Sequence, residues 1–166
     1  MTEAFQAAAE GFSRKATVYD VFGQDHPNLA RMRSQVYAHL LGFVQPPARL
    51  LELNAGTGGD AVYLAQQGLE VHATDIAPGM VASIRDKIAR YGLQDRLTVE
   101  QRSFTDLAAL PSGGFDAIFS NLGGLNCIED LAPVARSLSR LLKADWPRSL
   151  DELEERKKAA TNRTNR

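Results

Sequence analysis

The sequence is poor in the residues that build cross-links and metal sites. It contains one cysteine and three histidines among 166 residues. The single cysteine, Cys127, excludes a disulfide within the chain and a zinc site made of cysteines. The histidines, at positions 26, 39 and 72, lack the spacing of metal ligands. We therefore expect no metal centre, and the scarcity of cysteine fits a protein of the reducing cytoplasm.

Long apolar runs and an excess of charge of one sign are also lacking. No apolar stretch approaches the roughly 20 residues needed to cross a bilayer. The first residues, MTEAFQAAAEGF, have neither the basic start nor the apolar run of a signal peptide. The formal net charge is −1, so the overall charge attracts neither nucleic acid nor an anionic membrane. We expect no partner of either kind.

What the sequence does contain is an alternation of short apolar runs and amphipathic segments. The predicted strands are 49–54, 69–75, 97–102 and 115–120, and the predicted helices are 30–44, 60–67, 78–90 and 131–143. Strands that alternate with helices predict an α/β fold with a parallel sheet and right-handed crossovers. Ligands bind such sheets beyond the carboxyl ends of the strands. Functional residues are therefore expected at those ends.

A glycine-rich turn follows the first predicted strand, where residues 51–60 read LELNAGTGGD. Glycine permits positive φ and close approach of a ligand, and the start of the next helix offers unpaired N–H groups. Dinucleotide sites use G-x-G-x-x-G at this place. Here Asn54 stands at the first glycine position, and the carboxylate of Glu52 lies inside the strand. A turn that only packs a helix on a strand stays an open alternative for this segment alone.

An acidic residue, Asp75, ends the second predicted strand. A carboxylate there can accept hydrogen bonds from the two hydroxyls of a ribose. The alternative is an N-cap for the helix that begins at Pro78, although Asp75 lies slightly early for that role. The position therefore favours a site for a nucleoside-containing ligand.

Taken together, these segments resemble the motifs of class I S-adenosylmethionine-dependent methyltransferases. The matching stretches are LELNAGTG (51–58) for E/D-x-G-x-G-x-G, DIAPGM (75–80) for D-I/x-S-P-x-M, FDAIFSN (115–121) for F-D-x-V-x-x-N and ATVYD (16–20) for A-x-x-Y-D. QRSFTDL (101–107) stands where the family often has G-D-A-x-x-L. The resemblance covers about residues 16–143 and concerns fold and cofactor, not the acceptor.

The resemblance implies S-adenosyl-L-methionine as the cofactor. It gives the ribose to Asp75, the adenine to Ile76, Met80 and Phe104, and the cofactor carboxylate to Tyr19 and Arg33. Some of these residues have an open alternative. Met80 could be a core residue, Ser103 could only end a strand, and Tyr19 and Arg33 could be surface residues. The full predicted set is Tyr19, Arg33, Glu52, Asn54, Ala55, Gly56, Thr57, Gly58, Asp75, Ile76, Met80, Ser103, Phe104, Asn121 and Leu122. No catalytic residue is recognisable, and Cys127 is expected to be a small buried residue.

The same resemblance divides the chain into three parts. Residues 1–47 are a helical lid segment, 48–143 a Rossmann-like core that binds the cofactor, and 144–166 an atypical tail with a charged helix at 149–160. The family continues with L-L-x-P-G-G and a fifth strand, whereas this chain reads LLKADW at 141–146. We therefore expect a C-terminally truncated sheet of order 3-2-1-4. Its last strand, 115–120, would expose an edge that favours self-association.

The sequence thus predicts methyl transfer from S-adenosylmethionine to a small-molecule acceptor. The protein would act by positioning the two reactants, because no general base is evident. A non-catalytic remnant that binds the cofactor or a partner chain is the alternative that the missing strands favour. An NAD-binding oxidoreductase fragment is disfavoured by Asn54 and Glu52.

Overall fold

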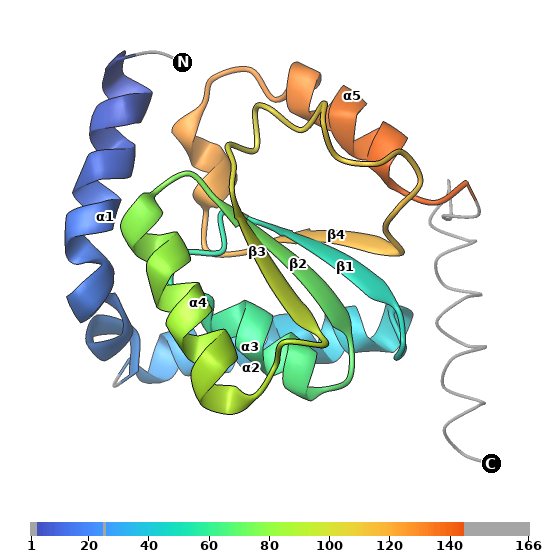
Figure 1. Ribbon diagram of the computed structural model, residues 1–166, viewed down its shortest axis with the longest axis horizontal. Helices are drawn as coiled ribbons and strands as arrows, with labels where there is room; N and C mark the ends of the chain where they lie inside the picture. Colours follow the sequence, from blue (N-terminus) through green and yellow to red (C-terminus); the bar gives the residue numbers. More distant parts are fainter. Residues whose placement is uncertain (1–2, 25, 145–166) are drawn as a thin grey trace.

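A four-stranded parallel sheet forms the centre of the computed structural model, which describes residues 3–24 and 26–144 (Figure 1). Its strands are β1 (Arg49–Leu53), β2 (Glu70–Asp75), β3 (Leu97–Gln101) and β4 (Ala117–Ser120). They lie in the order β3-β2-β1-β4, and every neighbouring pair is parallel. The predicted fold class and strand order are therefore confirmed.

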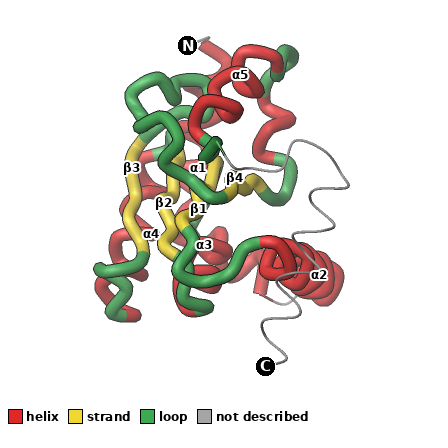
Figure 2. Tube along the Cα trace, turned by 90° about the vertical axis from the view of Figure 1, so that its right-hand side faces the viewer, coloured by secondary structure: helices red, strands yellow, loops and turns green. Residues whose placement is uncertain are grey.

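Helices cover both faces of this sheet (Figures 1 and 2). The helices are α1 (Glu3–Gln24), α2 (Pro27–Phe43), α3 (Gly59–Gln66), α4 (Pro78–Tyr91) and α5 (Ala132–Leu141), with a short 3-10 helix η1 (Gly124–Cys127). One buried cluster joins the sheet to α2, α3 and α4, and a second joins its other face to α5 and the loop after β3. These two clusters are the core of the fold.

The central strand β1 shows why both faces are buried. Its side chains alternate, so that Leu50 packs in the first cluster while Leu51 and Leu53 pack in the second. Glu52 shares a face with Leu50 by this alternation and is only 2% exposed. The strand therefore carries a buried carboxyl group near its carboxyl end.

A proline and a glycine mark the two ends of α4. Pro78 stands in its first turn, and Gly92 caps its end in the left-handed conformation, with φ of 63°. The bounds of the predicted strands and helices agree with the structure to within a few residues. The N-terminal segment contains a 22-residue helix, α1, that the sequence pattern indicated only as generally helical.

The outer edge of β4 differs from the expectation. Phe115 forms a parallel bridge with Leu142, and Lys143 N donates to Phe115 O at 2.9 Å. Phe115, Ala117 and Phe119 are buried. These side chains are buried because helices cover both faces of the sheet here. Self-association through the edge stays a prediction, and the predicted helix at 149–160 lies outside the described residues.

Helix α1 is attached to α4 at two points. Near its middle, Ser13 Oγ accepts a hydrogen bond from Gly79 N at 2.8 Å. Closer to its end, Asp20 Oδ2 lies 2.6 Å from Lys87 Nζ, and Asp20 Oδ1 accepts a hydrogen bond from Thr57. These contacts hold α1 across the carboxyl end of the sheet, next to the glycine-rich turn.

The first attachment predicts that Gly79→Ala destabilises the protein. A Cβ at this position would lie 2.4 Å from the backbone oxygen of Ser13, so the two helices must separate. Overpacking of this kind costs about 1–3 kcal/mol, and the midpoint of thermal unfolding should fall.

Gly11→Ala in α1 is the matched control, because nothing lies within 4 Å of the added Cβ. Within a helix this exchange stabilises by about 1 kcal/mol. Equal effects of the two substitutions on the melting temperature would contradict the close packing of α1 on α4.

Candidate functional site

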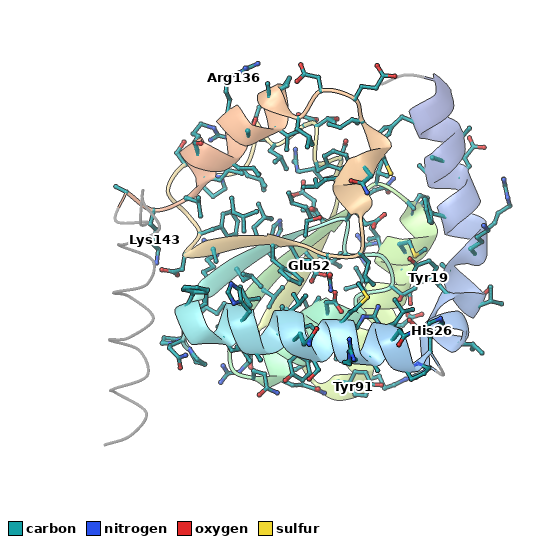
Figure 3. The ribbon with its side chains drawn as sticks, turned by 180° about the vertical axis from the view of Figure 1, so that it is seen from behind. Tyr19, His26, Glu52, Tyr91, Arg136 and Lys143 are labelled. Atoms are coloured by element: carbon teal, nitrogen blue, oxygen red, sulfur yellow. The ribbon has the colours of Figure 1, made fainter. Side chains whose placement is uncertain are left out.

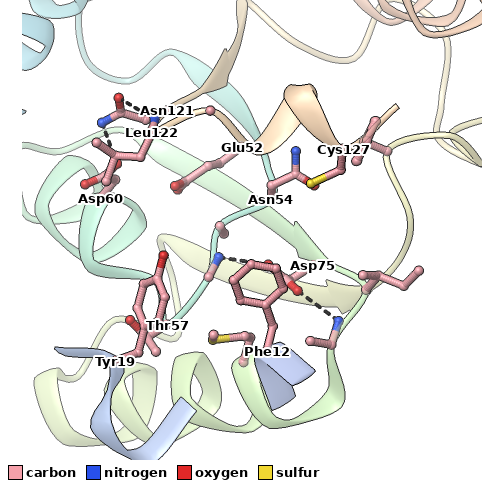
Figure 4. A pocket seen from close by; sticks show the side chains of 18 of the residues that line it. Phe12, Tyr19, Glu52, Asn54, Thr57, Asp60, Asp75, Asn121, Leu122 and Cys127 are labelled. Atoms are coloured by element: carbon pink, nitrogen blue, oxygen red, sulfur yellow. Dashed lines mark hydrogen bonds between the residues drawn. The ribbon is translucent and has the colours of Figure 1, made fainter. Parts of the chain in front are cut away.

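A pocket opens at the carboxyl ends of the strands (Figure 4). Its volume is about 980 Å³ when the open space at its mouth is included. Residues of α1, α2, the turn after β1, the end of β2 and the segment after β4 line it. All the predicted cofactor-binding residues line this pocket except Gly58 and Ser103. The motifs that are separate in the sequence therefore meet at one place.

The two exceptions lie beside the pocket. Gly58 adopts a φ of 79°, and a Cβ there would lie 2.7 Å from Ile84 Cγ1, so glycine permits the turn to pack on α4. Ser103 is buried, and its hydroxyl lies 2.7 Å from Thr105 Oγ1 and accepts from Thr105 N at 3.1 Å. Contact of Ser103 with a ligand stays a prediction.

The turn after β1, residues 54–58, is here called the glycine loop. Asn54, at the position of the expected glycine, has a φ of 53°, which asparagine tolerates better than most residues. Its side chain occupies the space that a Cβ at Gly124 would need, at 2.6 Å. Among the described residues its Nδ2 atom is buried without a hydrogen-bond partner. The departure from glycine thus adds a buried donor to the pocket wall.

Glu52 brings a carboxyl group into the interior behind the glycine loop (Figure 3). Its Oε2 atom has no hydrogen-bond partner within the described chain. Burial raises the pKa of Glu52 well above its ordinary value, and the charges of Asp60 and Asp75 raise it further, while Arg33 opposes them. A buried carboxyl without a partner is costly. It is best explained by a ligand that donates hydrogen bonds to it.

Asp75 connects the end of β2 to the glycine loop. Its Oδ2 accepts from Gly56 N at 2.9 Å, and its Oδ1 accepts from Ala77 N at 2.8 Å. Burial raises the pKa of Asp75, and these backbone donors partly offset the rise. The N-cap of α4 is Ala77, so the capping alternative for Asp75 was wrong. Each carboxylate oxygen keeps capacity to accept a second hydrogen bond.

Asp60, in the first turn of α3, is a pocket residue that the sequence analysis treated only as a helix start. Tyr37 OH donates to its Oδ1 at 2.5 Å, and Asn121 Nδ2 donates to its Oδ2 at 2.9 Å (Figure 4). Arg33 Nε lies 3.1 Å from Oδ1. Burial and the contact with Asp60 raise the pKa of Tyr37. The sequence signal that could have identified Asp60 as a pocket residue is its position, as an acidic residue just after the glycine loop.

Apolar side chains form part of the pocket wall. Ile76, Met80 and Phe104 contribute to it, as predicted, and Met80 is also part of a buried cluster. Helix α1 adds Phe5 and Phe12, which the sequence analysis did not identify. The rings of Phe5 and Phe104 meet edge to face, with centroids 5.8 Å apart. The wall can therefore hold a flat apolar group.

The segment after β4 forms the rim of the pocket. Leu122 has a φ of 54° and is exposed, and Gly123, Gly124 and Cys127 line the pocket beside it. Cys127 is exposed, so its expected burial was wrong; it lies in the short helix η1 at the mouth. In the part of the chain that the structure describes, no cluster of metal-ligating side chains occurs. No described helix is long and apolar enough to span a membrane.

Comparisons with known proteins agree with this geometry. Residues 50–145 match a family described as methyltransferase domain. An S-adenosyl-L-methionine-dependent Diels-Alderase of Talaromyces variabilis is 30% identical over 129 residues, covering 76% of this chain and 44% of that protein. A malonyl-[acyl-carrier protein] O-methyltransferase of Halorhodospira halophila is 33% identical over 136 residues, covering 74% and 42%. The chain thus spans less than half the length of these curated relatives.

Solved methyltransferase structures have a similar fold. A SAM-dependent methyltransferase from Aquifex aeolicus superposes with a TM-score of 0.64 at 20% identity, covering 79% of this chain and 67% of that one. That likeness supports the sheet order and the helical layers alone. The family match spans most of the sheet, the glycine loop and Asp75. The chain belongs to the class I S-adenosylmethionine-dependent methyltransferase family.

Proposed function

We propose that this chain binds S-adenosylmethionine in the pocket and takes part in methyl transfer to a small molecule. The observation that carries the proposal is that three pocket residues have a buried polar atom without a hydrogen-bond partner among the described residues, and two of these atoms, Glu52 Oε2 and Asn54 Nδ2, lie on β1 and the glycine loop. One accepts hydrogen bonds when ionised and the other donates. The amino-acid group of the cofactor offers both complements, an ammonium donor and a carboxylate acceptor. The residues present therefore fit the cofactor of the family.

The ammonium group would lie against Glu52. Of the three carboxyl groups that line the pocket, those of Glu52, Asp60 and Asp75, only that of Glu52 has a buried oxygen without a hydrogen-bond partner among the described residues. The carboxylate would be met by Arg33, the single cationic residue among the described residues that line the pocket. Opposite charges in a partly desolvated site attract more strongly than in water. This assignment orients the amino-acid end toward α2 and β1.

The nucleoside end would lie on the other side of the glycine loop. Asp75 has the free acceptor capacity for two ribose hydroxyls, since each oxygen accepts only one backbone N–H. The adenine would be covered by Ile76, Met80 and Phe104, with α1 above them.

The chain's own contribution to the reaction is placement. When bound, the cofactor supplies a methyl group on a positively charged sulfonium. The rim formed by Leu122, Gly123 and Cys127 is the open side of the pocket, from which an acceptor can approach. Holding two reactants in near-attack geometry is worth several kcal/mol without a base. The names of the relatives give different reactions, a Diels-Alderase and an O-methyltransferase, so the acceptor itself is not proposed.

Substitution of Asp75 tests the nucleoside end. Asp75→Ala should weaken S-adenosylmethionine binding at least tenfold in calorimetry, because a hydrogen bond to a charged group contributes about 1.5–3 kcal/mol. Asp95→Ala is the matched control, since Asp95 is exposed and lies outside the pocket. An Asp75→Ala variant that binds as tightly as the parent would remove Asp75 from the site.

The pH dependence of binding tests Glu52. Its pKa is raised in the free protein, so below that pKa the carboxyl is neutral and attracts the ammonium less. Affinity for S-adenosylmethionine should therefore rise as pH increases from about 4, the ordinary carboxyl range, through the raised pKa, and then level off.

Glu52→Gln is the matched variant, because it keeps the shape and removes the titration. Its affinity should be weaker at neutral pH and should lose most of this pH dependence. A parent protein whose affinity is flat over that range, or a variant with the same slope as the parent, would contradict the role of Glu52.

A further inference from the structure

The carboxylate of Asp60 joins three separate elements at one end of the pocket. It receives Tyr37 and Arg33 from α2, and Asn121 from the segment after β4. Asp60 itself belongs to α3, directly after the glycine loop. It is 6% exposed, so these contacts are made largely out of water, where charged hydrogen bonds are strong. The side chain of Asp60 thus connects α3 with α2 and with the segment after β4.

The contact with Arg33 uses only part of its guanidinium group. Asp60 lies against Nε, and no ion pair among residues 3–24 and 26–144 involves the terminal nitrogens of Arg33. Those nitrogens form a fork suited to a carboxylate. The ion pair at Nε restricts the side-chain rotations of Arg33 although Nε makes no hydrogen bond within the described residues, so less entropy is lost when a ligand binds.

The hydrogen bond between Asn121 and Asp60 connects Asp60 to the rim of the pocket. Asn121 Nδ2 donates to Asp60, and Asn121 Oδ1 accepts from Leu122 N at 2.8 Å. The orientation of this amide is therefore determined by Asp60 on one side. Leu122 holds a left-handed conformation that is unfavourable for a branched side chain, and the second bond helps to maintain it.

We propose that Asp60 is a positioning residue of the cofactor site, which holds Arg33 and Asn121 in place for the amino-acid group of the ligand. The inference rests on the proposed function, since it assumes that this end of the pocket receives that group. Asp60 would not touch the reacting atoms. Its effect would be confined to ligands that carry the amino-acid group.

Asp60→Asn is the sharpest test of this role. Tyr37 OH and Asn121 Nδ2 each donate to the carboxylate and Arg33 forms an ion pair with it, whereas an amide is neutral and has one accepting oxygen and one donating nitrogen. Either Arg33 or Asn121 then faces a donor and must turn away. The variant keeps the size of the side chain, so its pocket volume is unchanged.

Two ligands can distinguish a positioning role of Asp60 from a general contribution of Asp60 to the structure of the pocket. S-adenosylhomocysteine carries the amino-acid group, and 5′-methylthioadenosine is the same nucleoside without it. In calorimetry, Asp60→Asn should lower the affinity for S-adenosylhomocysteine roughly tenfold, which corresponds to the loss of a charged hydrogen bond. The affinity for methylthioadenosine should stay within about twofold of the parent value. Arg33→Gln should show the same split. The double variant should be no weaker than the single ones, because both remove one coupled interaction.

Arg31→Gln is the matched control: it removes an exposed arginine from the same helix and should change neither affinity. Equal losses for both ligands, or no loss for either, would overturn the positioning role. Whether or not Asp60→Asn folds, Arg33→Gln must show the split, and its absence also overturns the proposal. If the parent protein binds no S-adenosylhomocysteine, the proposed function fails and this inference with it; if the parent binds and Asp60→Asn is unaffected, only the inference fails.

Discussion

Three carboxyl groups meet at the carboxyl edge of the sheet, and the pocket depends on how each is compensated. Asp75 is paired with backbone N–H groups, and Asp60 with side chains of α2 and of the segment after β4. Glu52 lies between them with an unpaired oxygen and a raised pKa. Burying an uncompensated carboxyl is expensive. The arrangement is therefore consistent with a site whose remaining partner arrives with the ligand.

The rest of the fold places these groups. Parallel strands bring the ends of β1, β2 and β4 to the same edge, and short buried strands leave their last residues beside the turn to the next helix. Helices α1 and α2 close the pocket from the N-terminal side through Asp20, Ser13 and Arg33. The N-terminal segment is in this way part of the site and not an appendage to the core.

Much of this could be predicted from the sequence, because the strand ends carry local signals. The glycine loop, Asp75, and the proline and glycine that bound α4 each depend on neighbouring residues. Asp60 and the aromatic residues of α1 were missed, since their roles arise from contacts between distant segments. The pairing of Leu142 with Phe115 beside the edge of β4 was also not identified, because it joins two segments that are distant in the sequence. Cys127 was expected inside and lies at the rim.

The most direct test of the account is calorimetric titration of the chain with S-adenosylmethionine in two buffers of different ionisation enthalpy, with NAD as the comparison. The account predicts that S-adenosylmethionine binds and NAD does not. It also predicts that, at a pH below the raised pKa of Glu52, the observed heat differs between the buffers, because Glu52 releases a proton when the ammonium group binds beside it. Binding of NAD in preference, or no binding of S-adenosylmethionine, would contradict the central claim.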